Sequence, residues 1–305
     1  MDKSDIELLN QITDADKLFD GAYNIRKDCE AIERHTTENI DIVPKKDVPG
    51  IDIIIKDNTQ GEDIYIPVII TRSGLKDVVY NDFHVGKNAN VVIYAGCGIH
   101  NAHENDAEHD GIHRFFLGEG STVKYVENHY GQGEGTGKRI LNPVTEITLE
   151  DGAVFEMETA QIKGVDSTVR ITKADLASNT NLVVKEKIMT HDEQFASTEF
   201  ELNLNGENSS ANLTSRAVAV GNSVQTFVSK VYGNDKCFSH VSCDAIIKDN
   251  AKVTSIPEIT ANNVNANLVH EAAIGKIAQE QLVKLMTLGF SEEEAEEEII
   301  KGFLK

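Results

Sequence analysis

A cysteine and a histidine–glutamate pair lie in the last quarter of this sequence and have side chains able to bind metal. Cys243 stands in Val-Ser-Cys-Asp-Ala, whereas His270 and Glu271 stand in Leu-Val-His-Glu-Ala, and Glu271 follows the cysteine by 28 residues. A thiolate binds iron and sulfide strongly, and a carboxylate is a harder, weaker ligand. If the chain coils so that these segments meet, the pair would suit a metal cluster that must later be released. The alternative is a buried structural cysteine and a surface glutamate.

A second group of possible ligands begins at another cysteine. One cysteine and four of the ten histidines fall within seventeen residues, beside four carboxylates. Sulfur and imidazole ligands together suit zinc or iron. Because the spacing matches no established metal motif, a hydrated polar loop is the alternative interpretation. The candidate ligands are Cys97, His100, His103, His109 and His113.

A glycine-rich stretch resembles a phosphate-binding loop only at first sight. In the run from Gly131 to Arg139, the first glycine of the GxxxxGK[ST] motif would fall on Gln132, and Arg139 replaces the Ser or Thr that holds magnesium. We therefore predict a flexible loop and no nucleotide site in this chain. Any dependence on ATP must come from a partner.

The composition of the 305 residues restricts the possible partners. A net charge of -21 argues against binding to nucleic acid or to an anionic membrane. Aromatic residues make up 6% of the chain and Trp is absent, which counts against carbohydrate recognition. The charged N-terminus has no apolar run long enough for a signal peptide or a membrane span, so we expect a cytoplasmic protein. The four cysteines lack CxxC spacing and are expected to be thiols.

The chain divides into three segments by pattern. Apolar residues recur at helical intervals from Lys3 to about Glu38, with Asp14 and Asp16 able to cap a second helix, so residues 1–48 are predicted to be helical. Residues 49–272 are dominated by strand patterns. Residues 273–305 return to helical spacing, and Ser291-Glu-Glu-Glu predicts a capping box.

One sequence pattern recurs within the strand region: a turn residue and a small residue, followed by alternating apolar positions. It begins at Asn88, Gly120, Gly152 and Asn179, and returns at intervals of about 27 to 32 residues. Each unit is too small to close a core alone, but stacked units share one. A mainly β fold follows, a right-handed parallel β-helix (solenoid) with short helical segments at both ends. A two-sheet sandwich is the alternative, but tight hairpin signals are sparse.

The C-terminal residues resemble a known family. The segments Cys243-Asp-Ala-Ile-Ile, Ser255-Ile-Pro-Glu-Ile and Leu268-Val-His-Glu-Ala-Ala, followed by Ile300-Lys-Gly-Phe, are similar to the C-terminal signature of the SufB/SufD family over about 60 residues. These proteins are scaffolds of the SUF iron–sulfur cluster assembly machinery. The resemblance implies that this chain, like the family, folds as a right-handed parallel β-helix with helical ends. It also places Cys243 at the cysteine implicated in building the nascent cluster, and Glu271, after His270, at the glutamate of the His-Glu-Ala signature.

The resemblance also implies partners. The C-terminal helices are similar to the segment that docks a SufC-type ABC ATPase, and family pairing would join two β-helices into a homodimer with two ATPase subunits. The abbreviated N-terminal portion and the Cys97 region resemble the short, minimal SUF-like branch, which leaves the full ligand set open. The expected function is therefore a non-enzymatic scaffold for a transient iron–sulfur cluster, with ATPase activity in the partner. The predicted docking residues are Leu282, Leu285, Met286, Ile299 and Phe303.

Two other functions fit parts of the sequence. The chain would be a metal-free adaptor if it binds the ATPase and carries no cluster. It would be a carbohydrate-active β-helix hydrolase or lyase if paired carboxylates cleave a glycan. The C-terminal helices also have a simpler interpretation, in which they only cap the solenoid.

Overall fold

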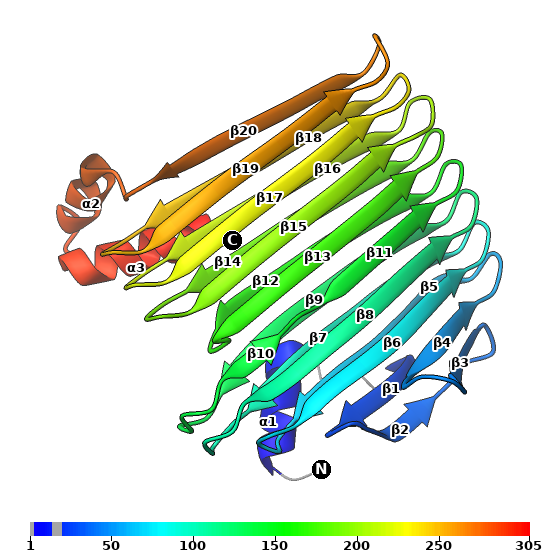
Figure 1. Cartoon of the computed structure of the whole chain (residues 1–305), viewed down its shortest axis with the longest axis horizontal. Helices are drawn as coiled ribbons and strands as arrows, with labels where there is room; N and C mark the ends of the chain where they lie inside the picture. The colour runs from blue at the N-terminus through cyan, green and yellow to red at the C-terminus, as the bar shows by residue number, and fades with distance from the viewer. Residues whose placement is uncertain (1–2, 14–19) are drawn as a thin grey trace.

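The computed structural model describes residues 3–13 and 20–305 and is a β-solenoid of about eight turns, with three short helices near the ends of the chain (Figure 1). From β4 onward the chain alternates between two ten-stranded sheets, with β10 and β11 sharing one position, so that each turn adds to both sheets. Strand order is β2-β1-β5-β7-β9-β12-β14-β16-β18-β20 in one sheet and β19-β17-β15-β13-β10-β8-β6-β4-β3 in the other, with β11 beside β8 and β13. The predicted mainly β solenoid is confirmed.

The elements are, in chain order, α1 (Lys3–Ile12), β1 (Ala22–Lys27), β2 (Glu30–His35), β3 (Ile40–Pro44), β4 (Gly50–Ile55), β5 (Gln60–Ile70), β6 (Lys76–Val85), β7 (Asn90–His100), β8 (Ala107–Leu117), β9 (Thr122–Gln132), β10 (Arg139–Leu141), β11 (Val144–Leu149), β12 (Val154–Lys163), β13 (Ser167–Leu176), β14 (Asn181–Thr190), β15 (Phe195–Leu204), β16 (Ser210–Ala219), β17 (Val224–Gly233), β18 (Phe238–Ile247), β19 (Lys252–Ala261), β20 (Asn267–Gly275), α2 (Gln279–Met286) and α3 (Glu292–Phe303).

Each copy of the repeated sequence pattern corresponds to one turn of the solenoid. Asn88, Gly120, Gly152, Asn179 and Asn208 all have positive φ, between 54° and 72°, and each stands two residues before a strand of the first sheet. Glycine adopts this conformation without a Cβ clash, and asparagine is the side chain that tolerates it best. The turn residue therefore sets the start of each strand.

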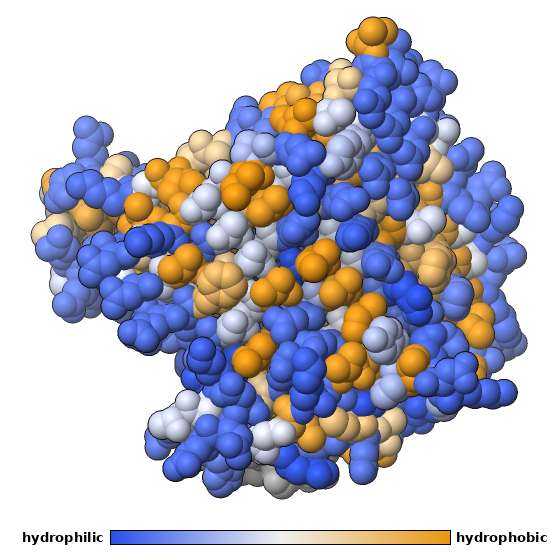
Figure 2. Space-filling model, viewed as in Figure 1, coloured by the Kyte–Doolittle hydropathy of each residue, from blue (hydrophilic) through white to orange (hydrophobic). Residues whose placement is uncertain are grey.

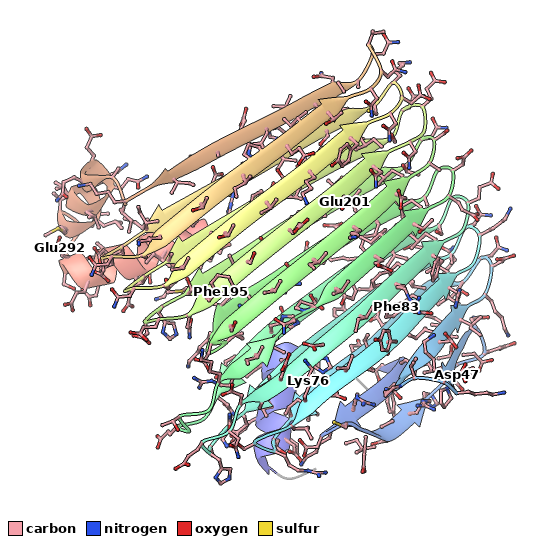
Figure 3. All side chains as sticks on the ribbon, in the orientation of Figure 1. Asp47, Lys76, Phe83, Phe195, Glu201 and Glu292 are labelled. Carbon is pink, nitrogen blue, oxygen red and sulfur yellow. The ribbon has the colours of Figure 1, made fainter. Side chains whose placement is uncertain are left out.

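Alternation along each strand builds the core. In β9 every second residue is buried, and parallel pairing places inward residues of successive strands above one another. The resulting apolar core is continuous from Ala22 to Cys243. Figure 3 shows the side chains along both faces of the strands, with Phe83 of β6 and Glu201 of β15 labelled on one sheet.

The N-terminal segment differs from the helical prediction. Only α1 is helical among the described residues of 1–48, and β1, β2 and β3 follow it. Asp28 and Cys29, with φ of 48° and 72°, form the turn of an antiparallel β1–β2 hairpin. The helical prediction is confirmed for Lys3–Ile12 and wrong for the strands that follow, because β1 pairs with β5 and buries Ala22 and Ile25, and such tertiary pairing overrides helical spacing. The predicted caps Asp14 and Asp16 lie outside the described residues.

The glycine-rich stretch forms a loop between β9 and β10, as predicted, and packs against the neighbouring loop. Gly135 N–H donates to the Asn101 carbonyl at 3.1 Å, and Gly137 N–H donates to the His103 carbonyl at 2.9 Å. A Cβ on Gly135 would lie 2.3 Å from the His103 backbone. The glycines therefore allow one loop to pack directly on the backbone of another.

The two ends of the solenoid differ. Antiparallel strands β2 and β3 form the sheet edges at one end, whereas parallel strands β19 and β20 form the edges at the other, which we call the open end; each of these four strands pairs on one side only. Three isoleucines of this open end, Ile256, Ile259 and Ile274, are 40–48% exposed. The helices α2 and α3 lie to one side of it (Figure 1). Figure 2 shows that hydrophobic residues are otherwise interspersed with hydrophilic ones on this face. No helix in the described ranges is long and apolar enough to span a bilayer.

Candidate cluster and metal sites

Cys243 and Glu271 lie on neighbouring strands but do not share a face. The register of β18 and β20 pairs Cys243 with Ala272 and Ser242 with Glu271. Cys243 points into the solenoid and is 1% exposed, whereas the Glu271 side chain is 68% exposed. The expected thiolate beside a carboxylate is therefore not formed within one chain.

Cys243 is an enclosed thiol one strand below the open end. It lines a cavity of about 10 Å³ with Glu186, Ser215 and Thr198. Ser215 is its partner on β16 and donates to Glu186 Oε2 at 2.7 Å. Burial raises the pKa of the Cys243 thiol to about 11. The sulfur is therefore protonated in the isolated chain, and a metal that binds it must displace the proton.

His270 faces the same interior as Cys243. It pairs with Val241, two residues from the cysteine on the inward side of β18. Its Nδ1 atom lies 3.3 Å from Ser229 Oγ, and its buried Nε2 atom has no hydrogen-bond partner. Burial lowers the pKa of His270 and favours the neutral imidazole that binds metal. Cys243 and His270 therefore form a sulfur and nitrogen pair near the open end.

The outer face of the same strands carries a different set of side chains that could bind metal. Glu271 Oε2 lies 3.5 Å from His240 Nε2, and Ser242 donates to Asp244 Oδ2 at 3.2 Å. His240 and Asp244 were not predicted as site residues. Both residues lie an odd number of positions from Cys243 on the same strand. Because side chains alternate along a strand, this spacing alone could have placed them on the face opposite the thiol.

Cys97 belongs to a separate region of the interior. It lies on β7 and is 2% exposed. Five strand-to-strand steps of about 4.8 Å, or about 24 Å, separate β7 from β18 in the sheet. One chain therefore does not bring Cys97 and Cys243 to a common cluster.

The four predicted histidines divide into two groups. His109 and His113 point into the solenoid from β8 and are 5% and 7% exposed. His100 ends β7 with a buried Nδ1 atom that lacks a partner, and His103 is exposed in the following loop. The structure therefore places His109 and His113, but not His103, near Cys97.

Buried charges surround this region. Asp77 accepts hydrogen bonds from Arg26 at 2.6 and 2.9 Å, and although burial disfavours its charge, Arg26 and His109 lower its pKa well below the usual range. Arg170 donates to Glu127 and to His129 Nδ1. Burial opposes ionisation of Glu127, but Arg170 holds its pKa well below the usual range.

These interior groups were mostly missed by sequence reasoning. Glu127, His129 and Arg170 are each at most 6% exposed. Both sides of their strands carry polar residues, so that alternation alone does not identify the inward side. The pairing of Cys97 with His129 shows that they face the same interior.

An acidic group on the surface is already neutralised. Among the described residues, Asp52, Asp82 and His84 have possible ligand atoms within 4.8 Å of one another. However, Lys45 bridges the two carboxylates, and Arg114 donates twice to Asp82 at 2.7 and 2.8 Å. This group forms an ion-pair network.

The predicted docking residues have different degrees of burial. Leu282 is 5% exposed and supports the helical pair, whereas Met286 is 42% exposed. Leu285 is half-buried, and Ile299 and Phe303 line an open groove of about 790 Å³ between α3 and the outer side of β18 and β20. Other apolar residues of this region are also exposed: Val283, Leu288 and Phe290.

These features define a class of protein: a β-solenoid with a buried cysteine and an inward histidine, both able to bind metal, below its open end. Residues 81–303 match the family model for the SUF system FeS cluster assembly SufBD core domain. The chain therefore belongs to the SufBD family of iron–sulfur cluster assembly proteins.

The relatives include archaeal and bacterial proteins. An iron–sulfur cluster assembly SufBD family protein of Pyrococcus horikoshii is 32% identical over 233 residues, which cover 76% of this chain and 69% of that protein. Another, from Methanocaldococcus jannaschii, is 30% identical over 190 residues, covering 62% of this chain and 60% of its own length. The iron–sulfur cluster assembly protein SufB of Bacillus subtilis is 44% identical over 68 residues, which cover 22% of this chain and 15% of that protein.

Proposed function

We propose that this protein is a non-enzymatic scaffold on which an iron–sulfur cluster is assembled near Cys243 and then passed on. The observation that carries the proposal is the position of Cys243 and His270 on one inner face beside the open end, in a member of a cluster assembly family. A thiolate with an imidazole binds iron more weakly than four thiolates would, which suits release of the cluster. Iron and sulfide are the cargo of this site.

A second copy of the chain would complete the ligand set. Cys243 and His270 alone are too few ligands for a cluster, and Glu271 lies on the other side of the sheet. The open end offers unpaired strand edges together with exposed Ile256, Ile259 and Ile274. Such edges and apolar residues are features of an interface between strands. We propose a homodimer joined through these ends, in which Glu271 with His240 lies at the rim.

The helical pair would bind a SufC-type ABC ATPase. Met286 and Leu288 expose apolar side chains, and α3 is held to the solenoid by Arg216, which donates to the Phe303 carbonyl at 3.0 Å. Movement of α3 would therefore pull on β16, which lies next to the strand that carries Cys243. Two scaffold and two ATPase subunits would let ATP-driven closure shear the junction and change access to the cluster.

Anaerobic reconstitution with iron and sulfide tests the proposal. The wild-type chain is expected to hold a cluster, detected by absorption and by iron and sulfide content, and Cys243→Ala is expected to lose most of it. Cys237→Ala is the matched control, because Cys237 is also a buried free thiol just before β18. Equal yields in the wild type and Cys243→Ala would exclude Cys243 as a ligand.

A further inference from the structure

His270 is held inside the solenoid by side chains of the opposite sheet. Its Nδ1 atom lies 3.3 Å from Oγ of Ser229, which is on the inward side of β17 and is 0% exposed. The His270 ring also lies beside the ring of Phe227, with centroids 6.5 Å apart. Phe227 in turn lines the cavity that contains Cys243. Two residues of β17 therefore contact the imidazole next to the proposed cluster ligand.

Ser229 makes no other side-chain hydrogen bond among the described residues. Its partners on the neighbouring strands are Phe200 of β15 and Pro257 of β19, and neither of these side chains has a hydrogen-bonding atom. A buried hydroxyl costs free energy unless it is hydrogen-bonded. The contact with His270 is therefore the interaction that accounts for a serine at this buried position.

The hydrogen bond to Ser229 decides which ring nitrogen keeps a lone pair. A neutral imidazole carries one hydrogen, either on Nδ1 or on Nε2. The buried Nε2 atom of His270 has no hydrogen-bond partner, and an unpaired buried N–H is rarer in proteins than an unpaired acceptor. We therefore assign the hydrogen to Nδ1, where Ser229 Oγ accepts it, and Nε2 keeps its lone pair inside the solenoid.

The same hydrogen bond suits a histidine that binds metal. Such a histidine keeps its hydrogen on the nitrogen that is not bound to the metal, and an oxygen acceptor there fixes the tautomer and the orientation of the ring. Ser229 supplies this oxygen from the sheet opposite His270. Because β20 is an edge strand that pairs only with β18, this bond restrains a side chain whose own strand is supported on one side.

We propose that Ser229 is a positioning residue, which holds His270 so that its Nε2 atom is free to bind the iron–sulfur cluster. This inference rests on the proposed function, in which Cys243 and His270 bind the cluster. Ser229 itself binds no iron. It accepts the Nδ1 hydrogen and thereby fixes both the tautomer and the angle at which the ring enters the interior.

The tautomer of His270 tests the proposal in the cluster-free chain. Long-range ¹H–¹⁵N NMR of the full chain, labelled at histidine, distinguishes Nδ1–H rings from Nε2–H rings, and comparison with His270→Gln identifies the signals of His270. The wild type is expected to show the Nδ1–H ring. Ser229→Ala removes the acceptor and is expected to shift the ring to Nε2–H or to a mixture of the two tautomers.

Retention of the cluster tests the consequence for function. After anaerobic reconstitution, the chelator concentration that removes half of the cluster is expected to fall about 10- to 100-fold in Ser229→Ala. Ser229→Thr keeps the hydroxyl and is expected to keep both the Nδ1–H ring and the cluster. Urea unfolding shows whether each variant is folded, and the tautomer and cluster retention of Ser229→Ala decide if Ser229→Thr is not.

Ser239→Ala is the matched control. Ser239 is also an inward serine, 1% exposed, on the strand that carries Cys243, but its Oγ atom has no hydrogen-bond partner. Its replacement removes the same atom from the same part of the interior without touching the bond to His270. Both the tautomer and the retention of the cluster are expected to match those of the wild type.

The proposal is overturned if wild-type His270 is an Nε2–H ring, or if Ser229→Ala keeps the Nδ1–H ring, since weaker retention would then reflect packing alone. A shifted tautomer with unchanged retention also overturns it. If the cluster does not form, or survives in Cys243→Ala, the proposed function fails and the role of Ser229 toward the cluster fails with it. The tautomers would then still show whether Ser229 orients His270, so the two failures are distinguishable.

Discussion

Cys243 and Glu271 occupy neighbouring strands of one sheet and point to opposite sides of it. The coil at this point repeats after 29 residues, as the pairing of Cys243 with Ala272 shows, and Glu271 follows the cysteine by 28. A shift of one residue on a strand exchanges the inner and outer faces. Because Ala272 is the inward partner of the thiol, His270, two residues before it on β20, also points inward, whereas Glu271 points outward. This difference makes the two members of the His-Glu pair experimentally separable.

We expect His270→Ala to reduce cluster yield more than Glu271→Ala does. His270 shares the interior with Cys243 and has a free Nε2 atom, whereas Glu271 is largely exposed and contacts His240. Iron and sulfide per chain after anaerobic reconstitution measure the effect. Urea unfolding is the control, and Glu271→Ala should change the free energy of unfolding by no more than about 0.5 kcal/mol. If Glu271→Ala lost the cluster and His270→Ala kept it, the cluster site would lie on the outer face instead.

Asp77 should contribute to the pH dependence of stability. Its pKa is lowered in the folded chain, so its contribution is present above the unfolded value of about 3.9 and is lost as pH falls through the folded pKa. Asp77→Asn also leaves buried Arg26 without its anion, and we expect it to cost about 3–5 kcal/mol at pH 7. Between about pH 5 and 3, the wild type should lose more stability than the variant. Urea unfolding across this range gives both slopes, and parallel curves would contradict the prediction.

Two leucines of the helical pair should separate folding from partner binding. Leu288→Ala should leave stability within about 0.5 kcal/mol of wild type, because this side chain is 71% exposed, but should weaken binding of the ATPase. Leu282→Ala should destabilise the helical pair by about 2–5 kcal/mol, because this side chain is buried. Binding to the purified ATPase partner by calorimetry and unfolding by circular dichroism measure the two effects. Unchanged binding by Leu288→Ala would place the docking surface elsewhere.

The sequence was sufficient for the architecture because the solenoid depends on local signals. Turn residues such as Asn88 and Gly120 require positive φ, and alternation predicts an inward face on each strand. The capping box is equally local and is confirmed: Ser291 Oγ accepts from Glu294 N–H, and the Glu294 side chain accepts from Ser291 N–H. These features depend on residues a few positions apart.

The contents of the interior depend on register, which the sequence alone does not define. The repeat varies between about 27 and 32 residues, so that the residues stacked on Cys97 or Cys243 follow only from the observed pairing. Glu127 and Arg170 resemble outward charges in the sequence because polar residues occur on both sides of their strands. Their ion pair forms across 43 residues, between the two sheets.

Two glycines provide a test of how the glycine-rich loop is held. Gly135→Ala should destabilise the chain by about 1–3 kcal/mol, because its Cβ would lie 2.3 Å from the backbone of His103 and that backbone is itself fixed by Gly137. Gly275→Ala is the matched control, since no atom lies within 4 Å of its Cβ position. Urea unfolding gives the global effect, and hydrogen exchange at the Gly135 and Gly137 amides gives the local one. Equal stability and equal exchange in the two variants would show that the loop does not need its close backbone packing.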